Sequence, residues 1–227
     1  MSSVLPALAL VTIGQAPRHD LAAAVIDGLP AGIEISQRGV LDGLSADEVT
    51  ARYGSRPGGE LLVTKLADGT VVTLDAAAVD RGLQDAVTAA EVSGAGTIVV
   101  LCTGGFPDLH TENAWLVEPD AVVTATSAGL LGGRPVGILV PMPDQIDAAS
   151  RKWHALEEPS FAAASPYGSD AAVIAAARRL VDDGADALIL DCMGYAPHHR
   201  DAIRAAGITA PVLVSGSVLG AALGAAL

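Results

Sequence analysis

Aromatic residues, cysteines and cations are all scarce in this sequence. Only seven of its 227 residues are aromatic (2 Phe, 2 Trp and 3 Tyr), yet 51% are hydrophobic, so the core has to be built mainly from Ala, Val, Leu and Ile. This composition is typical of α/β domains and excludes a disordered chain. Two cysteines are too few for a disulfide framework. The length allows one large domain or two small ones.

Acidic residues outnumber basic ones two to one. Lys plus Arg total 13 and Asp plus Glu total 26, which sets the formal net charge at −13. Nucleic acids and anionic membranes bind clustered Lys and Arg, so we expect neither as a partner. No apolar run reaches the roughly 18 residues of a spanning helix, and no basic segment precedes the apolar residues 1–14. We therefore expect a cytoplasmic protein that acts on a small molecule, with self-association into a homo-oligomer left open.

Short apolar runs alternate with longer amphipathic segments along the chain. Continuously apolar runs, such as 97–101, are typical of parallel strands covered on both faces. We expect strands at 7–13, 33–36, 61–65, 70–73, 97–101, 136–140, 161–164, 187–190 and 212–214, and helices at 19–27, 76–92, 144–156, 169–183, 198–206 and 217–227. A Ser-x-x-Glu capping box at 45–48 opens another short helix, and Asp68-Gly69 predicts a hairpin. The alternation predicts βαβ units and parallel sheets, with a domain boundary near 132–135.

The residues that follow buried strands are the candidate site residues, because ligands of open parallel sheets bind outside the carboxyl ends of the strands. Gln15 and Arg18 follow the first strand, and Ser215 follows the last one. Cys102 and Cys192 follow the corresponding central strands of the two halves of the chain. The only two cysteines therefore occupy matching places, each followed by a turn that contains glycine.

Two cysteines at matching strand ends have several interpretations. A free cysteine is often a small buried hydrophobe, and a disulfide is uncommon in the cytoplasm. Zinc needs three or four ligands, but Cys-x-x-Cys and His-Glu-x-x-His patterns are absent, and the adjacent His198 and His199 are more typical of a helix start. Two facing thiols suit the inversion of a carbon stereocentre next to a carboxylate or carbonyl. One thiolate removes the proton from one face, and the other thiol returns a proton to the opposite face.

The turns after the cysteines supply groups that suit a carboxylate ligand. Turn amides at a helix N-terminus would lower a cysteine pKa and hold a carboxylate, and an arginine would pair with it. The candidate substrate-binding residues are Gln15, Arg18, Thr103, Gly104, Gly194 and Ser215. Asp191 either tunes the neighbouring thiol or makes a structural hydrogen bond, and Ser215 and Ser217 are also candidate caps of the last helix. Trp115 and Trp153 either wall the cleft or fill the core.

Several segments resemble the AroM family. They are 12–18 (Thr-Ile-Gly-Gln-Ala-Pro-Arg), 41–44, 190–195 (Leu-Asp-Cys-Met-Gly-Tyr), 199–201 and 211–215. The likeness covers essentially the whole chain, and the family looks like a branch of the aspartate/glutamate/hydantoin racemase superfamily. It implies an α/β fold of two similar Rossmann-like domains with parallel sheets and an active site in the interdomain cleft. It also implies one catalytic cysteine from each domain, Cys102 and Cys192, and neither pyridoxal phosphate nor another cofactor nor a metal.

On this fold we divide the chain into residues 1–132 plus 213–227, with the C-terminal helix returning to the first domain, and residues 133–212. The superfamily motif Cys-Asn-Thr reads Cys102-Thr103-Gly104 here, and the glutamate racemase motif Gly-Cys-Thr-His-Tyr-Pro reads Asp-Cys-Met-Gly-Tyr-Ala at 191–196. These departures leave the substrate open. We expect a cofactor-independent racemase, epimerase or isomerase that acts on a small carboxylate-bearing substrate, amino-acid or hydantoin-like. A decarboxylase or cis–trans isomerase of the same fold, and a non-catalytic protein that binds a small anion, are the alternatives.

Overall fold

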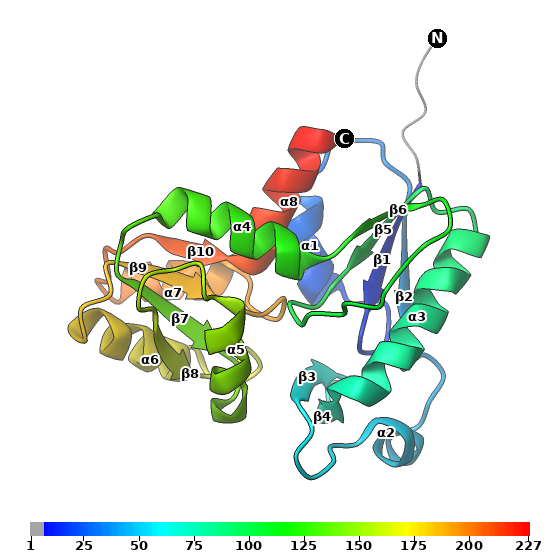
Figure 1. The fold of residues 1–227 in the computed structure, drawn as a ribbon, viewed down its shortest axis with the longest axis horizontal. Helices are drawn as coiled ribbons and strands as arrows, with labels where there is room; N and C mark the ends of the chain where they lie inside the picture. The colour runs from blue at the N-terminus through cyan, green and yellow to red at the C-terminus, as the bar shows by residue number, and fades with distance from the viewer. Residues whose placement is uncertain (1–6) are drawn as a thin grey trace.

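Two four-stranded parallel sheets form the framework of the molecule (Figure 1). The computed structural model describes residues 7–227; residues 1–6, which belong to the N-terminal segment without a basic region, lie outside this description. The first sheet contains β1 (Leu8–Thr12), β2 (Ile35–Gly39), β5 (Thr97–Val100) and β6 (Trp115–Val117). The second contains β7 (Val136–Val140), β8 (Ser160–Ala163), β9 (Ala187–Leu190) and β10 (Val212–Val214).

Both sheets have the same strand order. The first is β2-β1-β5-β6 and the second, read from its β8 edge, is β8-β7-β9-β10, with every neighbouring pair parallel. In each half the first strand therefore lies between the second and the third, and the fourth lies outside the third. The prediction of two similar Rossmann-like α/β domains is confirmed, although no repeat in the sequence reveals their likeness.

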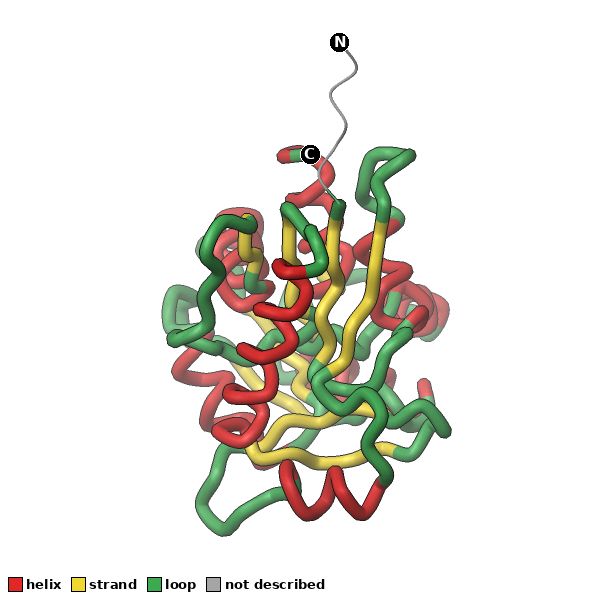
Figure 2. The backbone as a smooth tube through the Cα atoms, turned by 90° about the vertical axis from the view of Figure 1, so that its right-hand side faces the viewer, coloured by secondary structure: helices red, strands yellow, loops and turns green. Residues whose placement is uncertain are grey.

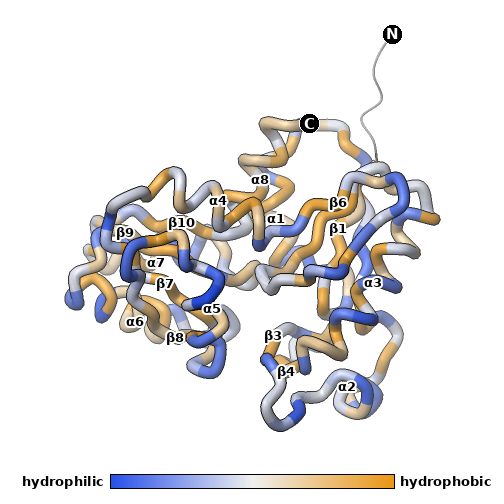
Figure 3. The backbone as a smooth tube through the Cα atoms, in the orientation of Figure 1, coloured by the Kyte–Doolittle hydropathy of each residue, from blue (hydrophilic) through white to orange (hydrophobic). Residues whose placement is uncertain are grey.

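Helices flank the strands, as the red segments on either side of the yellow strands in Figure 2 show. They are α1 (His19–Ile26), α2 (Ala46–Tyr53), α3 (Ala76–Val92), α4 (Pro119–Leu131), α5 (Ile146–Lys152), α6 (Asp170–Asp182), α7 (Pro197–Ala205) and α8 (Ser215–Ala226). The central strands β1, β5, β7 and β9 are buried along their whole length and supply much of the core, and β1 and β7 are hydrophobic in Figure 3. One apolar cluster joins the halves, because it includes Leu10, Ile138 and Leu219. Within residues 7–227, no helix has both the length and the hydropathy needed to cross a bilayer.

The first half carries an inserted hairpin. Strands β3 (Leu61–Lys65) and β4 (Val71–Asp75) pair antiparallel, as the Asp68-Gly69 turn predicts. Gly69 has a φ of +89°, a conformation that glycine adopts without a steric cost. The predicted capping box of Ser45 is also present at the start of α2, and Asp75 caps α3. Figure 1 shows the hairpin and α2 below the first sheet.

Three parts of the chain differ from the sequence prediction. Strand β6 and helix α4 occupy a stretch for which the pattern predicts no element, because β6 has only three residues and α4 begins without a side-chain cap. The strand predicted at 33–36 lies at Ile35–Gly39. The helix predicted at 144–156 consists of a 3-10 turn, Pro143–Gln145, followed by α5, which ends at Lys152.

Helix α8 follows the last strand of the second sheet but packs against α1 and α4 of the first half. Since β10 pairs with β9 through Val214, the division between the halves falls after this strand and not inside it. The contact with α1 requires glycine, because a Cβ on Gly220 would lie 2.6 Å from the carbonyl oxygen of Val25. Gly216 and Gly224, one helical turn away on either side, also lie close to the α1 segment.

Gly220→Ala is expected to destabilise the protein by about 1–3 kcal/mol, because the new methyl group has to displace α1 from a packed interface. The matched control is Gly129→Ala in α4, where an added Cβ meets no atom within 4 Å. There the higher helix propensity of alanine should stabilise the protein by about 0.5–1 kcal/mol. Urea unfolding of the wild type and both variants measures the two effects. Equal stabilisation by both substitutions would contradict the close approach of α8 to α1.

Candidate active site

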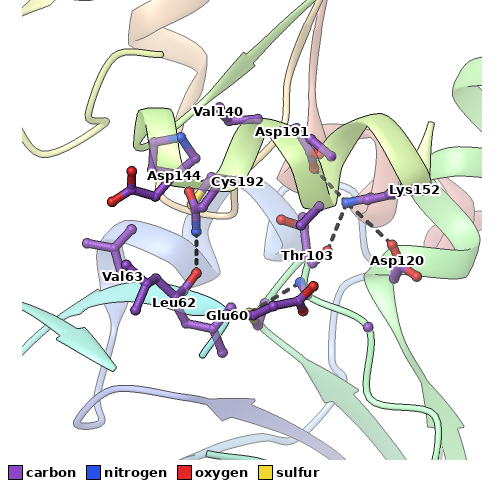
Figure 4. Close-up of a pocket in the computed structure, with 18 of the residues that line it drawn as sticks. Glu60, Leu62, Val63, Thr103, Asp120, Val140, Asp144, Lys152, Asp191 and Cys192 are labelled. Carbon is purple, nitrogen blue, oxygen red and sulfur yellow. Dashed lines mark hydrogen bonds and ion pairs between the residues drawn. The ribbon is translucent and has the colours of Figure 1, made fainter. Parts of the chain in front are cut away.

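Cys102 and Cys192 line the same cavity, which has a volume of about 280 Å³ (Figure 4). Cys102 lies just beyond β5 and Cys192 just beyond β9, and these are the third strands of the two sheets. Both cysteines are free thiols. Residues of both halves line the cavity, including Ile13 from the first and Val140 from the second. The matching topology of the two halves therefore brings the two thiols to one site.

Burial dominates the electrostatics of both thiols. It raises the pKa of Cys102 to about 11 and the pKa of Cys192 to about 12. The backbone N–H of Gly104 donates to Cys102 Sγ at 3.4 Å, and that of Gly194 donates to Cys192 Sγ at 3.3 Å. These hydrogen bonds lower the two pKa values by less than burial raises them. The turn amides therefore lower the pKa of both cysteines as expected, but they do so from turns and not from the first turn of a helix, and burial outweighs them.

A lysine that the sequence argument did not single out lies close to both thiols. Lys152 is the last residue of α5, and its side chain is 14% exposed. Its Nζ donates to the Asp191 carboxylate at 2.7 Å and to the Thr103 carbonyl oxygen at 2.8 Å, and it lies 3.4 Å from the Asp120 carboxylate (Figure 4). These partners come from both halves of the chain, so the ammonium group links the halves. Its charge lowers the pKa of both thiols against the larger effect of burial.

Asp191 connects this lysine to the core. Its second carboxylate oxygen accepts a hydrogen bond from Trp153 Nε1 at 2.6 Å. Trp153 is 1% exposed and anchors Asp191, whereas Trp115 is 46% exposed on β6, so neither tryptophan lines the cavity. Asp191 holds Lys152 and at the same time raises the pKa of both thiols through its negative charge. Asp191 therefore both makes a structural hydrogen bond and tunes the pKa of the neighbouring thiol.

The predicted binding residues fall into two groups. Thr103 and Gly104 line the cavity together with Gly105, in the turn after β5. The other four do not belong to its lining: Gln15, Arg18, Gly194 and Ser215. The amide of Gln15 is used inside the first half, where it donates to the carbonyl oxygens of Leu41 and Leu44 and accepts from the N–H of Ala67.

Ser215 ties α8 to the second sheet. Its buried hydroxyl donates to the carbonyl oxygen of Leu190, the last residue of β9, at 2.8 Å. The N-cap of α8 is Val214, without a side-chain hydrogen bond, so the expectation that Ser215 or Ser217 caps this helix is wrong. This hydrogen bond fixes the end of β9, directly before Asp191 and Cys192.

Tyr167 lies near Cys192, outside the residues that line the cavity, and the sequence pattern did not reveal it. It follows β8, and its hydroxyl accepts a hydrogen bond from Arg18 Nη2 at 3.3 Å across the two halves. Arg18 is 5% exposed and pairs with Asp20 at 2.8 Å, so its charge is already balanced. A Cβ on Gly194 would lie 2.9 Å from the Tyr167 hydroxyl oxygen, which explains the glycine after Cys192. The expectation that site residues follow the carboxyl ends of strands would have pointed to this tyrosine if it had been extended to the segment after β8.

The hairpin contributes Leu61, Leu62 and Val63 to the cavity lining. Gln145 Nε2, in the 3-10 turn after β7, donates to the carbonyl oxygen of Leu61 at 2.9 Å. Arg151 of α5 pairs with Glu60 at 2.5 Å. Both contacts connect the start of β3 in the first half to the segment that carries Lys152 in the second. The inserted hairpin therefore helps to enclose the thiols.

One group of potential metal ligands lies outside the cavity lining. Ligand atoms of Asp170, His198 and His199 are within 4.8 Å of one another. His199 is buried, and its Nδ1 accepts a hydrogen bond from the backbone N–H of Ala196 at 3.0 Å. Burial also lowers the pKa of His199. His199 thus contributes to the start of α7, in keeping with the interpretation of adjacent histidines at a helix start.

The family of the chain follows from a match over nearly its full length. The family described as AroM protein matches residues 8–225, which include both sheets and both cysteines. The chain belongs to the AroM family. None of the curated proteins compared with this AroM-family chain matches it.

Solved structures share the fold of this AroM-family protein. A glutamate racemase from Bacillus anthracis aligns with a TM-score of 0.66 and 14% identity over 99% of this chain and 82% of its own. An allantoin racemase from Klebsiella pneumoniae aligns with a TM-score of 0.64 and 16% identity over 96% of this chain and 86% of its own. A liganded arylmalonate decarboxylase variant aligns with a TM-score of 0.64 and 14% identity over 98% of this chain and 92% of its own. At such identities the likeness establishes the fold alone, because one fold carries different activities.

Proposed function

We propose that this AroM-family protein is a cofactor-independent racemase, epimerase or isomerase in which Cys102 and Cys192 act as an acid/base pair. Its substrate is a small carboxylate-bearing molecule, amino-acid or hydantoin-like, with an acidic hydrogen on the carbon next to the carboxylate or carbonyl. The observation that carries the proposal is the pair of free thiols that reach one cavity from equivalent strand ends. Racemases with this fold support it.

The two sulfurs together account for both proton transfers of the reaction. One cysteine enters as a thiolate and takes the hydrogen from carbon, and the electron pair of the broken C–H bond moves into the carbonyl as an enolate. The other cysteine enters as a thiol and returns a proton to the opposite face of the same carbon. The protonation states of the two sulfurs are then reversed, which suits the conversion of the opposite enantiomer.

The turn after β5 supplies a binding place for the substrate oxygens. The N–H of Gly104 is used by Cys102 Sγ, whereas in residues 7–227 the N–H groups of Thr103 and Gly105 donate to no other residue. Two free amides in one turn are suited to a carboxylate or to a developing enolate oxygen. Glycine at 104 and 105 keeps this approach open.

Solvent hydrogen exchange tests the proposed function. Single enantiomers of amino acids, N-carbamoyl amino acids, 5-substituted hydantoins and hydroxy acids are incubated with the protein in D2O and followed by NMR. We expect deuterium at the α-carbon together with loss of optical purity for at least one class. The matched control is the double variant Cys102→Ser/Cys192→Ser, prepared in the same way, which should show neither. If a compound bound tightly but none of the compounds exchanged its α-hydrogen for deuterium, the proposal would be overturned in favour of a protein that only binds a small anion.

A further inference from the structure

Two buried oxygen atoms on residues that line the thiol cavity have no hydrogen-bond donor. In residues 7–227, three buried side-chain polar atoms lack a hydrogen-bond partner: Gln145 Oε1, Asp120 Oδ1 and Ser127 Oγ. Gln145 and Asp120 line the cavity, and Ser127, inside α4, does not. Buried acceptors in folded proteins are normally satisfied, so two of them around one cavity indicate a ligand that brings donors.

The hydrogen bond made by Gln145 Nε2 determines which way the side-chain amide is oriented. Its Nε2 donates to the carbonyl oxygen of Leu61 at 2.9 Å, and the reversed amide would place two acceptors against each other there. Oε1 is therefore the free end of the side chain, and it can only accept a hydrogen bond. Leu61 and Gln145 both line the cavity, so the hydrogen bond between them orients the amide within the lining.

Asp120 keeps acceptor capacity despite its neighbouring cation. The Asp120 Oδ1 atom lies 3.4 Å from Lys152 Nζ, longer than a good N–H···O hydrogen bond. Lys152 instead directs short hydrogen bonds to Asp191 at 2.7 Å and to the Thr103 carbonyl oxygen at 2.8 Å. A donor on the substrate would complete the coordination of Asp120 without breaking either of these bonds.

The charges around the cavity point to the same chemistry. Four carboxylates and two cations line it, so the formal balance is 2 − 4 = −2: Glu60, Asp120, Asp144, Asp191, Arg151 and Lys152. Arg151 is paired with Glu60, and Lys152 is paired with Asp191 and Asp120. Among the described cavity-lining residues, both cations are therefore already paired with carboxylates, and each negative charge on a ligand adds to the repulsion. A dianion would therefore meet repulsion, whereas N–H groups and positive charge would be favoured.

We infer that Gln145 and Asp120 select a substrate that presents N–H groups, as an amide, ureide or ammonium nitrogen does, and that the cavity excludes dicarboxylates. This inference rests on the proposed function, because it names the substrate class of the same site. Gln145 and Asp120 would accept hydrogen bonds from the nitrogen, while the turn at 103–105 would hold the single carboxylate or carbonyl oxygen.

Binding measurements separate this inference from the proposed chemistry. Calorimetry is performed on the wild type and on Cys102→Ser/Cys192→Ser, so that affinity is measured without turnover. The ligands are 5-alkyl or 5-benzyl hydantoins, their 1,3-dimethyl derivatives, the matching amino acids and the matching malonates, with methyl, isopropyl and benzyl side chains. Ligands that carry N–H groups should bind at least about tenfold more tightly than their methylated or dicarboxylate counterparts, because a site built around hydrogen bonds rejects ligands that lack the donor.

Gln145→Met tests the assigned residue. It removes the acceptor at similar length and should weaken N–H ligands by about tenfold while leaving the methylated ligands unchanged, whereas loss of the Leu61 contact alone would weaken both equally. Gln84→Met is the matched control, since Gln84 also bonds a backbone carbonyl oxygen, that of His110, but lies outside the cavity lining. Equal affinity for N–H and methylated ligands, tighter binding of malonates, or no binding of any N–H ligand would overturn the inference. A preference for N–H ligands without any hydrogen exchange would leave the inference standing and overturn the proposed function.

Discussion

Racemisation is expected to fall by about 10³-fold or more in Cys102→Ser and, separately, in Cys192→Ser, because each removes one member of an acid/base pair. A serine hydroxyl is close to a thiol in shape but is a far weaker acid, so the cavity is kept while proton transfer at one face is lost. Chiral chromatography of the reaction, started from each enantiomer, measures the rate. Thermal unfolding of both variants checks that the fold is retained.

The two single variants also distinguish a two-base from a one-base mechanism. In a two-base mechanism each variant keeps one intact thiol, so each should exchange hydrogen with solvent from only one enantiomer, and the two variants should prefer opposite enantiomers. This pattern is visible by NMR in D2O. A variant that still racemises at a rate close to the wild type would assign the chemistry to a single cysteine and contradict the pair.

Lys152→Met is expected to lower activity at neutral pH by about 10²-fold, because it removes the positive charge next to both thiols. Burial places the pKa of Cys102 at about 11 and that of Cys192 at about 12, so below these values the thiolate fraction, and with it the rate, rises with pH. The lysine lowers both pKa values, and its removal should shift the pH–rate profile to higher pH. Asp191→Asn should shift the profile to lower pH, since Asp191 raises both values.

Alkylation by iodoacetamide, followed peptide by peptide, measures the same shift without a substrate. At a given pH, both cysteines should react more slowly in Lys152→Met and faster in Asp191→Asn than in the wild type. Lys152→Met should also destabilise the fold by up to about 3 kcal/mol, because the Asp191 carboxylate, 4% exposed, loses its cation. Arg52→Met removes an exposed ion pair with Glu48 on α2 and should leave both properties unchanged. Identical alkylation profiles in wild type and Lys152→Met would exclude the electrostatic role.

The sequence predicted most elements of the fold because their patterns are local. Continuous apolar runs at 136–140, 187–190 and 212–214 agree with the bounds of β7, β9 and β10, and the hairpin turn and the capping box carry their own signals. Strand β6 and helix α4 escaped prediction because three residues at a sheet edge and an uncapped helix of small side chains have no strong pattern. Their positions depend on pairing with β5 and packing against α8.

The sequence likewise predicted some residues of the candidate site and not others. Cys102, Cys192, Thr103 and Gly104 were found because they directly follow strands, and the carboxyl ends of parallel strands face the ligand. Arg18 was predicted as a ligand-binding cation, yet Asp20 and Tyr167 already occupy its guanidinium group. No strand-end rule points to the groups that lie on helices or in the 3-10 turn: Asp120, Gln145 and Lys152.

Two cysteines, too few for a disulfide framework, proved more informative than any other residue type in the sequence. By itself the sequence predicted alternating strands and helices in both halves of the chain and a cysteine directly after a buried strand in each, because these features depend on short-range hydrophobic patterns and on order along the chain. Only the tertiary structure decided that the thiols share one cavity and that Lys152 lies close to both. It also decided which acceptors are left without donors. These properties depend on distances between segments far apart in the chain and on burial, and no local pattern encodes either of them.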